Sequence, residues 1–189
     1  MRALIPVITY IILVLGASCA VTHCAEPSHP NVMLLQNAQG GRSSGVVIKD
    51  DWVLTVAHAG EAPVASERIE HPELDLSLLH IKGAVGSIEF GPEPGAFDRL
   101  RAYGWHLGRN LLLTEGFQGR VIGDASTSVI DGCSGGALVN EKGQLIGILS
   151  TVVYSGTRNR DDASVVPHMA GYVPIDESVR NWIHSHINP

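Results

Sequence analysis

The 189-residue chain has few cysteines, no cluster of basic side chains and no zinc-binding motif. Three cysteines are too few for the disulfide framework of a small extracellular domain. Thirteen lysines and arginines form no run and are outnumbered by nineteen acidic residues, which excludes the basic surface that nucleic-acid binding requires. The spacings C-x-x-C and H-E-x-x-H are absent, and His184 and His186 are typical of solvent-exposed helix residues. The sequence therefore predicts no metal, no cofactor and no nucleic-acid partner.

The first 22 residues carry a single charged side chain, Arg2. The stretch that follows it is rich in Ile, Leu and Val and ends in small residues, which predicts a secretory signal peptide over residues 1–20 with cleavage after Ala20. Two alternatives stay open. The stretch is long enough for an uncleaved membrane anchor, and residues 15–19 loosely resemble a bacterial lipobox. We expect an exported protein, periplasmic or extracellular, that meets a membrane only through this segment.

The composition indicates a folded protein built mostly from short strands. Hydrophobic residues make up 44% of the chain and charged residues 17%, which is typical of one compact domain or two small lobes. Short apolar runs alternate with turn residues, and this pattern favours an all-β barrel or sandwich. The runs cover residues 31–36, 45–49, 52–57, 64–69, 76–81, 100–103, 111–114, 119–122, 137–139 and 145–153.

Only the C-terminal segment has the pattern of a helix. Asp176 is suited to cap its N-terminus, since a carboxylate there can accept hydrogen bonds from the first-turn amides. Val179, Trp182, Ile183 and Ile187 recur at helical spacing and would form one apolar stripe.

Three short motifs carry side chains that can do chemistry. Residues 53–58 (VLTVAH) end an apolar run with a histidine, residues 75–79 (DLSLL) begin one with an aspartate, and residues 132–136 (GCSGG) surround a serine with glycines. A serine hydroxyl is a poor nucleophile at neutral pH unless a base takes its proton and a carboxylate orients that base. The motifs supply all three groups.

Each of the three side chains can be given a role. Ser134 is the predicted nucleophile, His58 the general base and Asp75 the carboxylate that orients the imidazole. Glycines around Ser134 allow a sharp backbone turn, so that the amides of Gly132 and Ser134 can converge on a developing oxyanion.

Together the motifs resemble the trypsin-like (chymotrypsin-fold) serine proteases, in particular their bacterial and viral branch, over residues 31–187. The resemblance implies an all-β fold of two small six-stranded β-barrels with a C-terminal helix, and an endopeptidase that acts through an acyl-enzyme. Only 17 positions separate His58 from Asp75, which leaves room for a reduced first barrel. The Gly- and Pro-rich residues 91–95 mark the joint between lobes. The expected bounds are residues 27–188 for the domain, 31–91 for the first lobe, 97–175 for the second and 176–187 for the helix.

The resemblance also implies a supporting serine and a specificity pocket. Ser150 would donate a hydrogen bond to the aspartate. The pocket for the substrate residue before the cleaved bond (P1) would be lined by Ser128, Ser150, Thr151, Val152 and Gly171. None of these is acidic, so a lysine or arginine of the polypeptide substrate would be buried without a partner. We therefore expect a small or apolar P1 residue.

One position departs from the pattern of the family. Its activated zymogens have an aspartate before the nucleophile, which pairs with a newly cut N-terminal amine, whereas this chain has Cys133. We expect activity that does not depend on such an ion pair. The thiol is expected to pack as a small buried hydrophobe, with a disulfide to Cys24 as the alternative in an oxidising compartment.

Two other functions fit parts of the same pattern. A non-catalytic binding module descended from a protease would keep the fold without the reaction. An α/β-hydrolase esterase shares the G-x-S-x-G spacing around its nucleophile, but that fold places a helix directly after the serine. The residues after Gly136 instead predict a β-hairpin.

Overall fold

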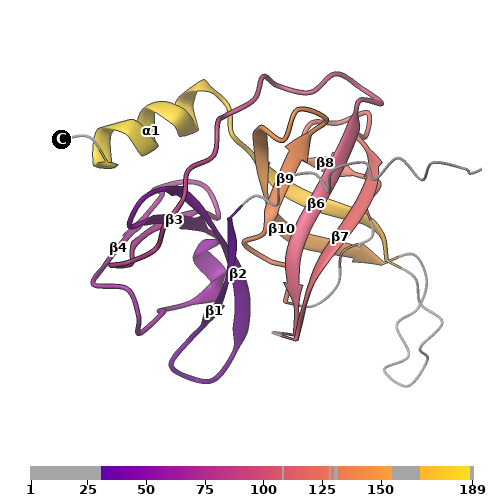
Figure 1. Cartoon of the computed structure of the whole chain (residues 1–189). Helices are drawn as coiled ribbons and strands as arrows, with labels where there is room; N and C mark the ends of the chain where they lie inside the picture. The colour runs from indigo at the N-terminus through magenta and orange to yellow at the C-terminus, as the bar shows by residue number, and fades with distance from the viewer. Residues whose placement is uncertain (1–30, 108, 128, 130–131, 155–166, 188–189) are drawn as a thin grey trace, which may run out of the picture.

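The computed structural model describes residues 31–107, 109–127, 129, 132–154 and 167–187, which form two β lobes and one helix (Figure 1). The predicted signal segment lies outside these residues. Within the described ranges, no helix is long and apolar enough to cross a membrane.

The first lobe is one antiparallel sheet of five strands in the order β1-β2-β3-β5-β4. It has one strand fewer than the sheet of the second lobe, in agreement with the expected reduction of the first barrel. The strands are β1 (Val32–Gln36), β2 (Arg42–Lys49), β3 (Trp52–Thr55), β4 (Glu67–Glu70) and β5 (Ser77–His80).

The second lobe is a six-stranded antiparallel sheet in the order β7-β6-β9-β10-β11-β8. An isolated bridge between Gln118 and Ala125 links the end of β7 to β8, so the two outer strands of the sheet approach each other. The strands are β6 (Arg99–His106), β7 (Asn110–Phe117), β8 (Asp124–Ala125), β9 (Ala137–Asn140), β10 (Leu145–Tyr154) and β11 (Pro167–Pro174).

The second sheet differs from the sequence expectations at three places. The strand predicted over residues 119–122 is wrong, because the backbone closes a turn in which Asp124 N donates to Val121 O at 3.2 Å. Val121 is 64% exposed, so the apolar pair that suggested a strand lies at the surface. Neither β8 nor β11 was predicted from the sequence, and the two terminal prolines of β11 argue against a strand.

The all-β fold rules out the α/β-hydrolase alternative. The chain continues from Ser134 through Gly136 into strand β9 rather than into a helix. Among the described residues the strand ladders are antiparallel, with a single parallel bridge between Phe90 and Leu145, whereas α/β folds have a largely parallel sheet covered by helices.

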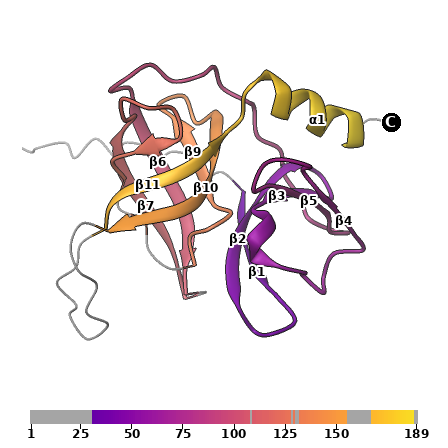
Figure 2. The same cartoon turned by 180° about the vertical axis from the view of Figure 1, so that it is seen from behind.

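One hydrophobic cluster spans the two lobes, whose sheets lie side by side in Figures 1 and 2. Apolar side chains of the first sheet pack in the same cluster as those of the second sheet and the helix. Burying each large aliphatic side chain stabilises the fold by about 1.5–3 kcal/mol. The buried members are Val46, Ile48, Leu54, Val56, Leu76, Leu78, Tyr103, Ala137, Val139, Leu145, Ile148, Val173, Ile175, Val179 and Ile183.

Helix α1 (Glu177–Ile187) leaves the second lobe and lies over the first (Figures 1 and 2). Asp176 caps it as predicted, since the Val179 amide donates to Asp176 Oδ1 at 2.8 Å. Val179 and Ile183 are fully buried in the shared core. The Trp182 ring meets the His71 ring of the first lobe edge-on, with centroids 4.9 Å apart. The helix therefore holds the two lobes together.

Removing the buried side chain of Ile183 tests this role of the helix. Ile183→Ala leaves a cavity in the shared core and is expected to lower the free energy of unfolding by about 2–5 kcal/mol, measured by urea denaturation. Asn181→Ala, at an exposed position of the same helix, is the control and should change it by less than about 0.5 kcal/mol. Equal effects of the two substitutions would contradict a packing role for α1.

Candidate active site

His58 lies in a short 3₁₀ helix, η1 (Ala57–Ala59), just after β3. The strand predicted to reach residue 57 ends two residues earlier, because the chain turns there. Two side chains hold the turn. Asn37 Nδ2 donates to Ala59 O at 3.1 Å, and Arg68 Nη2 donates to Ala57 O at 2.6 Å. The imidazole is half-exposed, with 50% of its side-chain surface accessible, so it can reach a substrate.

The Asp75 carboxylate accepts three hydrogen bonds. His58 Nδ1 lies 2.7 Å from Asp75 Oδ2, and the His58 backbone N–H donates to Oδ1 at 2.9 Å. Ser150 Oγ donates to Oδ2 at 2.7 Å, so the supporting contact expected of Ser150 is present. A proton on Nδ1 in this arrangement leaves Nε2 as the basic nitrogen of a neutral imidazole. Asp75 thus orients the histidine through both its ring and its backbone.

The pKa of Asp75 reflects these contacts. Partial burial raises the pKa of the carboxyl group, because it disfavours the charged form. The hydrogen bonds from Ser150, the His58 backbone and the His58 ring, together with the charge of His58, favour the carboxylate. The net result is an Asp75 pKa below its ordinary value. The Asp75 carboxyl group is therefore ionised at neutral pH.

Ser134 lies in a tight loop whose backbone requires glycine at two positions. Gly132 and Gly135 have φ angles of 95° and 84°, which side chains rarely adopt. A Cβ on Gly135 would lie 2.0 Å from the carbonyl oxygen of Ser44, so the loop presses against strand β2 of the first lobe. The Gly135 N–H donates to Leu149 O at 2.7 Å and fixes the loop to β10.

The Ser134 hydroxyl donates to the carbonyl oxygen of Ser150 at 3.2 Å. Within the described residues it makes no hydrogen bond to His58, so Ser134 and His58 are connected through Ser150 and Asp75. Catalytic hydrogen bonds are often long or misaligned without a substrate and tighten in the complex. The structure thus brings all four predicted residues into one site, with the hydroxyl turned toward β10.

The amides predicted to bind an oxyanion are available. In the described part of the chain, the N–H groups of Gly132 and Ser134 donate to no acceptor. The Gly132 carbonyl accepts a hydrogen bond from Ser44 Oγ at 3.0 Å. Backbone N–H groups without a partner next to a nucleophile are suited to stabilise negative charge on a reacting oxygen.

A narrow crevice adjoins Ser134 on the side of β10. Cys133 is 2% exposed, so its thiol packs among apolar side chains as expected. Gly171 faces Thr151, because a Cβ there would lie 2.1 Å from Thr151 Oγ1. Ser128 and the side chain of Val152, which were also expected in the pocket, lie outside the described part of the chain. The crevice is lined by Val129, Cys133, Ser134, Leu149, Ser150 and Thr151.

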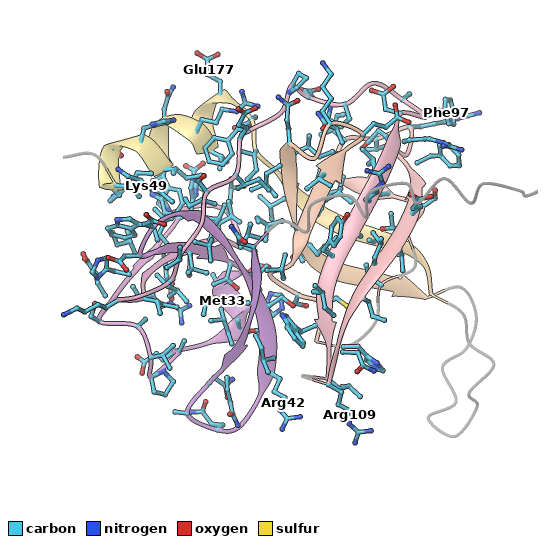
Figure 3. All side chains as sticks on the ribbon, viewed as in Figure 1. Met33, Arg42, Lys49, Phe97, Arg109 and Glu177 are labelled. Atoms are coloured by element: carbon cyan, nitrogen blue, oxygen red, sulfur yellow. The ribbon has the colours of Figure 1, made fainter. Side chains whose placement is uncertain are left out.

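Strand β2 meets the β6–β7 hairpin in a contact that joins the two lobes. Arg42 Nη1 donates to Leu107 O at 2.7 Å across the two lobes. Figure 3 shows Arg42 and Arg109 at this end of the lobes, with both side chains pointing outward. In the described ranges, no group of three or more His, Cys, Asp and Glu side chains could hold a metal ion.

Sequence reasoning missed the residues that brace the site. Asn37, Arg68 and Ser44 hold the histidine turn and the serine loop, yet they lie in no recognisable motif. The one sequence signal is a pair of serines at positions 43 and 44 in a strand whose other inner residues are apolar. Buried hydroxyls need partners, so such a pair indicates a contact without identifying it.

No protein-family model and no curated protein matches the chain. Several solved structures, however, are similar to it. An inactive mutant form of Rv3671c from Mycobacterium tuberculosis has a TM-score of 0.65 at 16% identity, over 85% of this chain and 89% of that one. A human pathogenic astrovirus serine protease has a TM-score of 0.59 at 15% identity, over 79% and 93%. Kallikrein-related peptidase 10 has a TM-score of 0.65 at 22% identity, over 87% and 98%.

The chain has the chymotrypsin fold. The predicted resemblance to trypsin-like serine proteases is thereby confirmed at the level of architecture. His58 in η1 and Ser150 in β10 meet at Asp75, so both lobes contribute to the candidate site.

The low pKa of Asp75 predicts how stability depends on pH. A carboxyl group whose pKa is lower in the folded state stabilises the protein above its unfolded pKa of about 3.9, and this contribution is lost as the pH falls through the folded pKa. Asp75→Asn should therefore destabilise the protein more at pH 7 than at about pH 3, as measured by chemical denaturation at both values. Glu141→Gln, at an exposed turn, is the control. A loss of the same size at both pH values would contradict the ionic role of Asp75.

Proposed function

We propose that the chain is a serine endopeptidase that hydrolyses peptide bonds with His58, Asp75 and Ser134. The observation that carries the proposal is the hydrogen-bonded set of His58, Asp75 and Ser150 beside the glycine loop that holds Ser134. A carboxylate that fixes an imidazole next to a serine serves to activate that serine. The chymotrypsin fold supports the proposal, because it places such groups between its lobes.

In the proposed reaction, the Ser134 oxygen attacks the carbonyl carbon of the substrate while His58 Nε2 takes the hydroxyl proton. Rotation of the Ser134 side chain away from the Ser150 carbonyl precedes this transfer. The Asp75 carboxylate stabilises the imidazolium that forms. General base catalysis of this kind contributes about 10²- to 10⁴-fold to the rate.

The tetrahedral intermediate carries a negative oxygen, which the N–H groups of Gly132 and Ser134 would bind. Loss of one such donor costs about 2.7–4 kcal/mol of transition-state stabilisation. When the carbon–nitrogen bond breaks, His58 returns the proton to the leaving amine and an acyl-enzyme on Ser134 remains. Water, deprotonated by the same histidine, then releases the acid product and restores Ser134.

We also propose that the protein is exported, on the basis of the signal-like residues 1–20. Its substrates would then be polypeptides outside the cytoplasm. We further propose a small or apolar P1 residue, because none of the residues expected to line the pocket is acidic.

The rival function is a catalytically silent module with the chymotrypsin fold. The observation that favours it is the hydrogen bond from Ser134 to the Ser150 carbonyl, which turns the hydroxyl away from His58. A silent module needs no activated serine, whereas a protease must bind covalent serine inhibitors. Chemical labelling therefore separates the two functions.

Replacement of the nucleophile gives the direct test. Wild-type protein should react with a fluorophosphonate probe and hydrolyse a fluorogenic peptide library varied at P1, with small or apolar residues preferred to lysine and arginine. Ser134→Ala should abolish labelling and reduce kcat by about 10⁶-fold, whereas Ser178→Ala, on the exposed face of α1, should behave as wild type. Labelling that persists in Ser134→Ala would refute the proposal, and an unlabelled wild type would favour the silent module.

The cysteine at position 133 predicts that activity does not depend on a newly cut N-terminal amine. Position 133 offers a buried thiol instead of a carboxylate, so a new amine has no acidic partner there. A protein made with additional residues before Asn31 should therefore hydrolyse the same peptides with the kcat/KM of a protein that begins at Asn31. Silence of the extended protein until it is trimmed would show that N-terminal processing controls the site.

A further inference from the structure

Ser44 is a fully buried polar residue on β2, in the lobe opposite the serine loop. A buried hydroxyl is stable only where its donor and its acceptor both find partners. The Ser44 hydroxyl has both. Its oxygen accepts the Trp105 N–H at 2.8 Å, and its proton goes to the Gly132 carbonyl at 3.0 Å. Because the Trp105 amide can only donate, the direction of the hydroxyl proton is fixed toward Gly132.

The backbone of Ser44 is held in the same place. Its N–H donates to the Ser134 carbonyl at 2.7 Å, and its carbonyl accepts the Thr55 hydroxyl at 2.7 Å. Gly135 packs so closely on Ser44 that a Cβ there would lie 2.0 Å from the Ser44 carbonyl oxygen. Ser44 is therefore a rigid reference point on the first lobe for the loop of the second.

The contact between Ser44 and Gly132 matters because little else holds Gly132 in place. Among the described residues, the bond from the Ser44 hydroxyl is the one hydrogen bond made by Gly132. Gly132 has a φ angle of 95°, and as a glycine it has wide backbone freedom. Its N–H is one of the two donors proposed to bind the oxyanion. A donor contributes most when it is held in place before the reaction begins.

We infer that the Ser44 hydroxyl is a positioning group that fixes Gly132 for oxyanion binding. The inference rests on the proposed function and adds to it a residue of the other lobe. Ser44 does not touch the reacting atoms. It acts through the Gly132 carbonyl, so that docking of the two lobes and alignment of the oxyanion donors are one event.

Ser44→Ala removes the hydroxyl and leaves the strand intact. We expect kcat to fall about 10- to 100-fold, less than or comparable to the loss of a donor itself, with KM unchanged. A peptide boronate, whose tetrahedral adduct on Ser134 places an oxygen where the oxyanion forms, should bind more weakly by the same factor. Ser43→Ala is the matched control. Ser43 is the adjacent, buried residue of β2, and in the described part of the chain its hydroxyl makes no hydrogen bond to the loop.

Two further results keep the test decisive. Melting temperatures show whether each variant is folded. If Ser44→Ala does not fold, Ser44→Cys keeps a weaker donor and should lower kcat and boronate affinity without changing KM. Unchanged kcat, an equal loss in Ser43→Ala, or a rise in KM alone would overturn the inference. A wild type without Ser134-dependent hydrolysis would instead refute the proposed function.

Discussion

The arrangement of the candidate site depends on the Asp75 carboxylate, on which hydrogen bonds from both lobes converge. The carboxylate accepts hydrogen bonds from His58 on the first lobe and from Ser150 on the second, so its position depends on both sheets. A partly buried carboxylate is costly unless its charge is satisfied. Three donors satisfy it here, and in return they orient the imidazole. The side chains that clamp η1 and the core that joins the lobes preserve this arrangement.

Local patterns in the sequence predicted most of the fold. Alternation of apolar runs with turn residues located the strands of the first sheet to within a few residues, and Asp176 marked the start of α1, because both signals depend on near neighbours. The strand predicted over residues 119–122 was wrong because an apolar pair at a turn resembles a short strand. Strand β11 was missed because its pairing with β10 is a long-range contact that outweighs its prolines.

The residues of the candidate site likewise divide into those that local sequence patterns predict and those that only long-range contacts reveal. His58, Asp75 and Ser134 each stand in a local motif, the family resemblance implied Ser150, and the structure brings the four together. Ser44 could not be recognised, since its partner Gly132 lies 88 residues further along the chain and a serine in a strand has no distinctive pattern. Motifs thus identify the groups that we propose react, whereas three-dimensional contacts identify the groups that hold them.

Helix α1 follows both lobes in the chain and contributes Val179 and Ile183 to the core between them. During synthesis from the N-terminus, the ribosome therefore releases the two sheets before it releases the segment that covers their junction. Until α1 docks, the apolar surface of that junction stays exposed to solvent, the condition in which partly folded chains are prone to aggregate. Completion of the fold, and with it of the paired lobes, thus waits for the arrival of this helix.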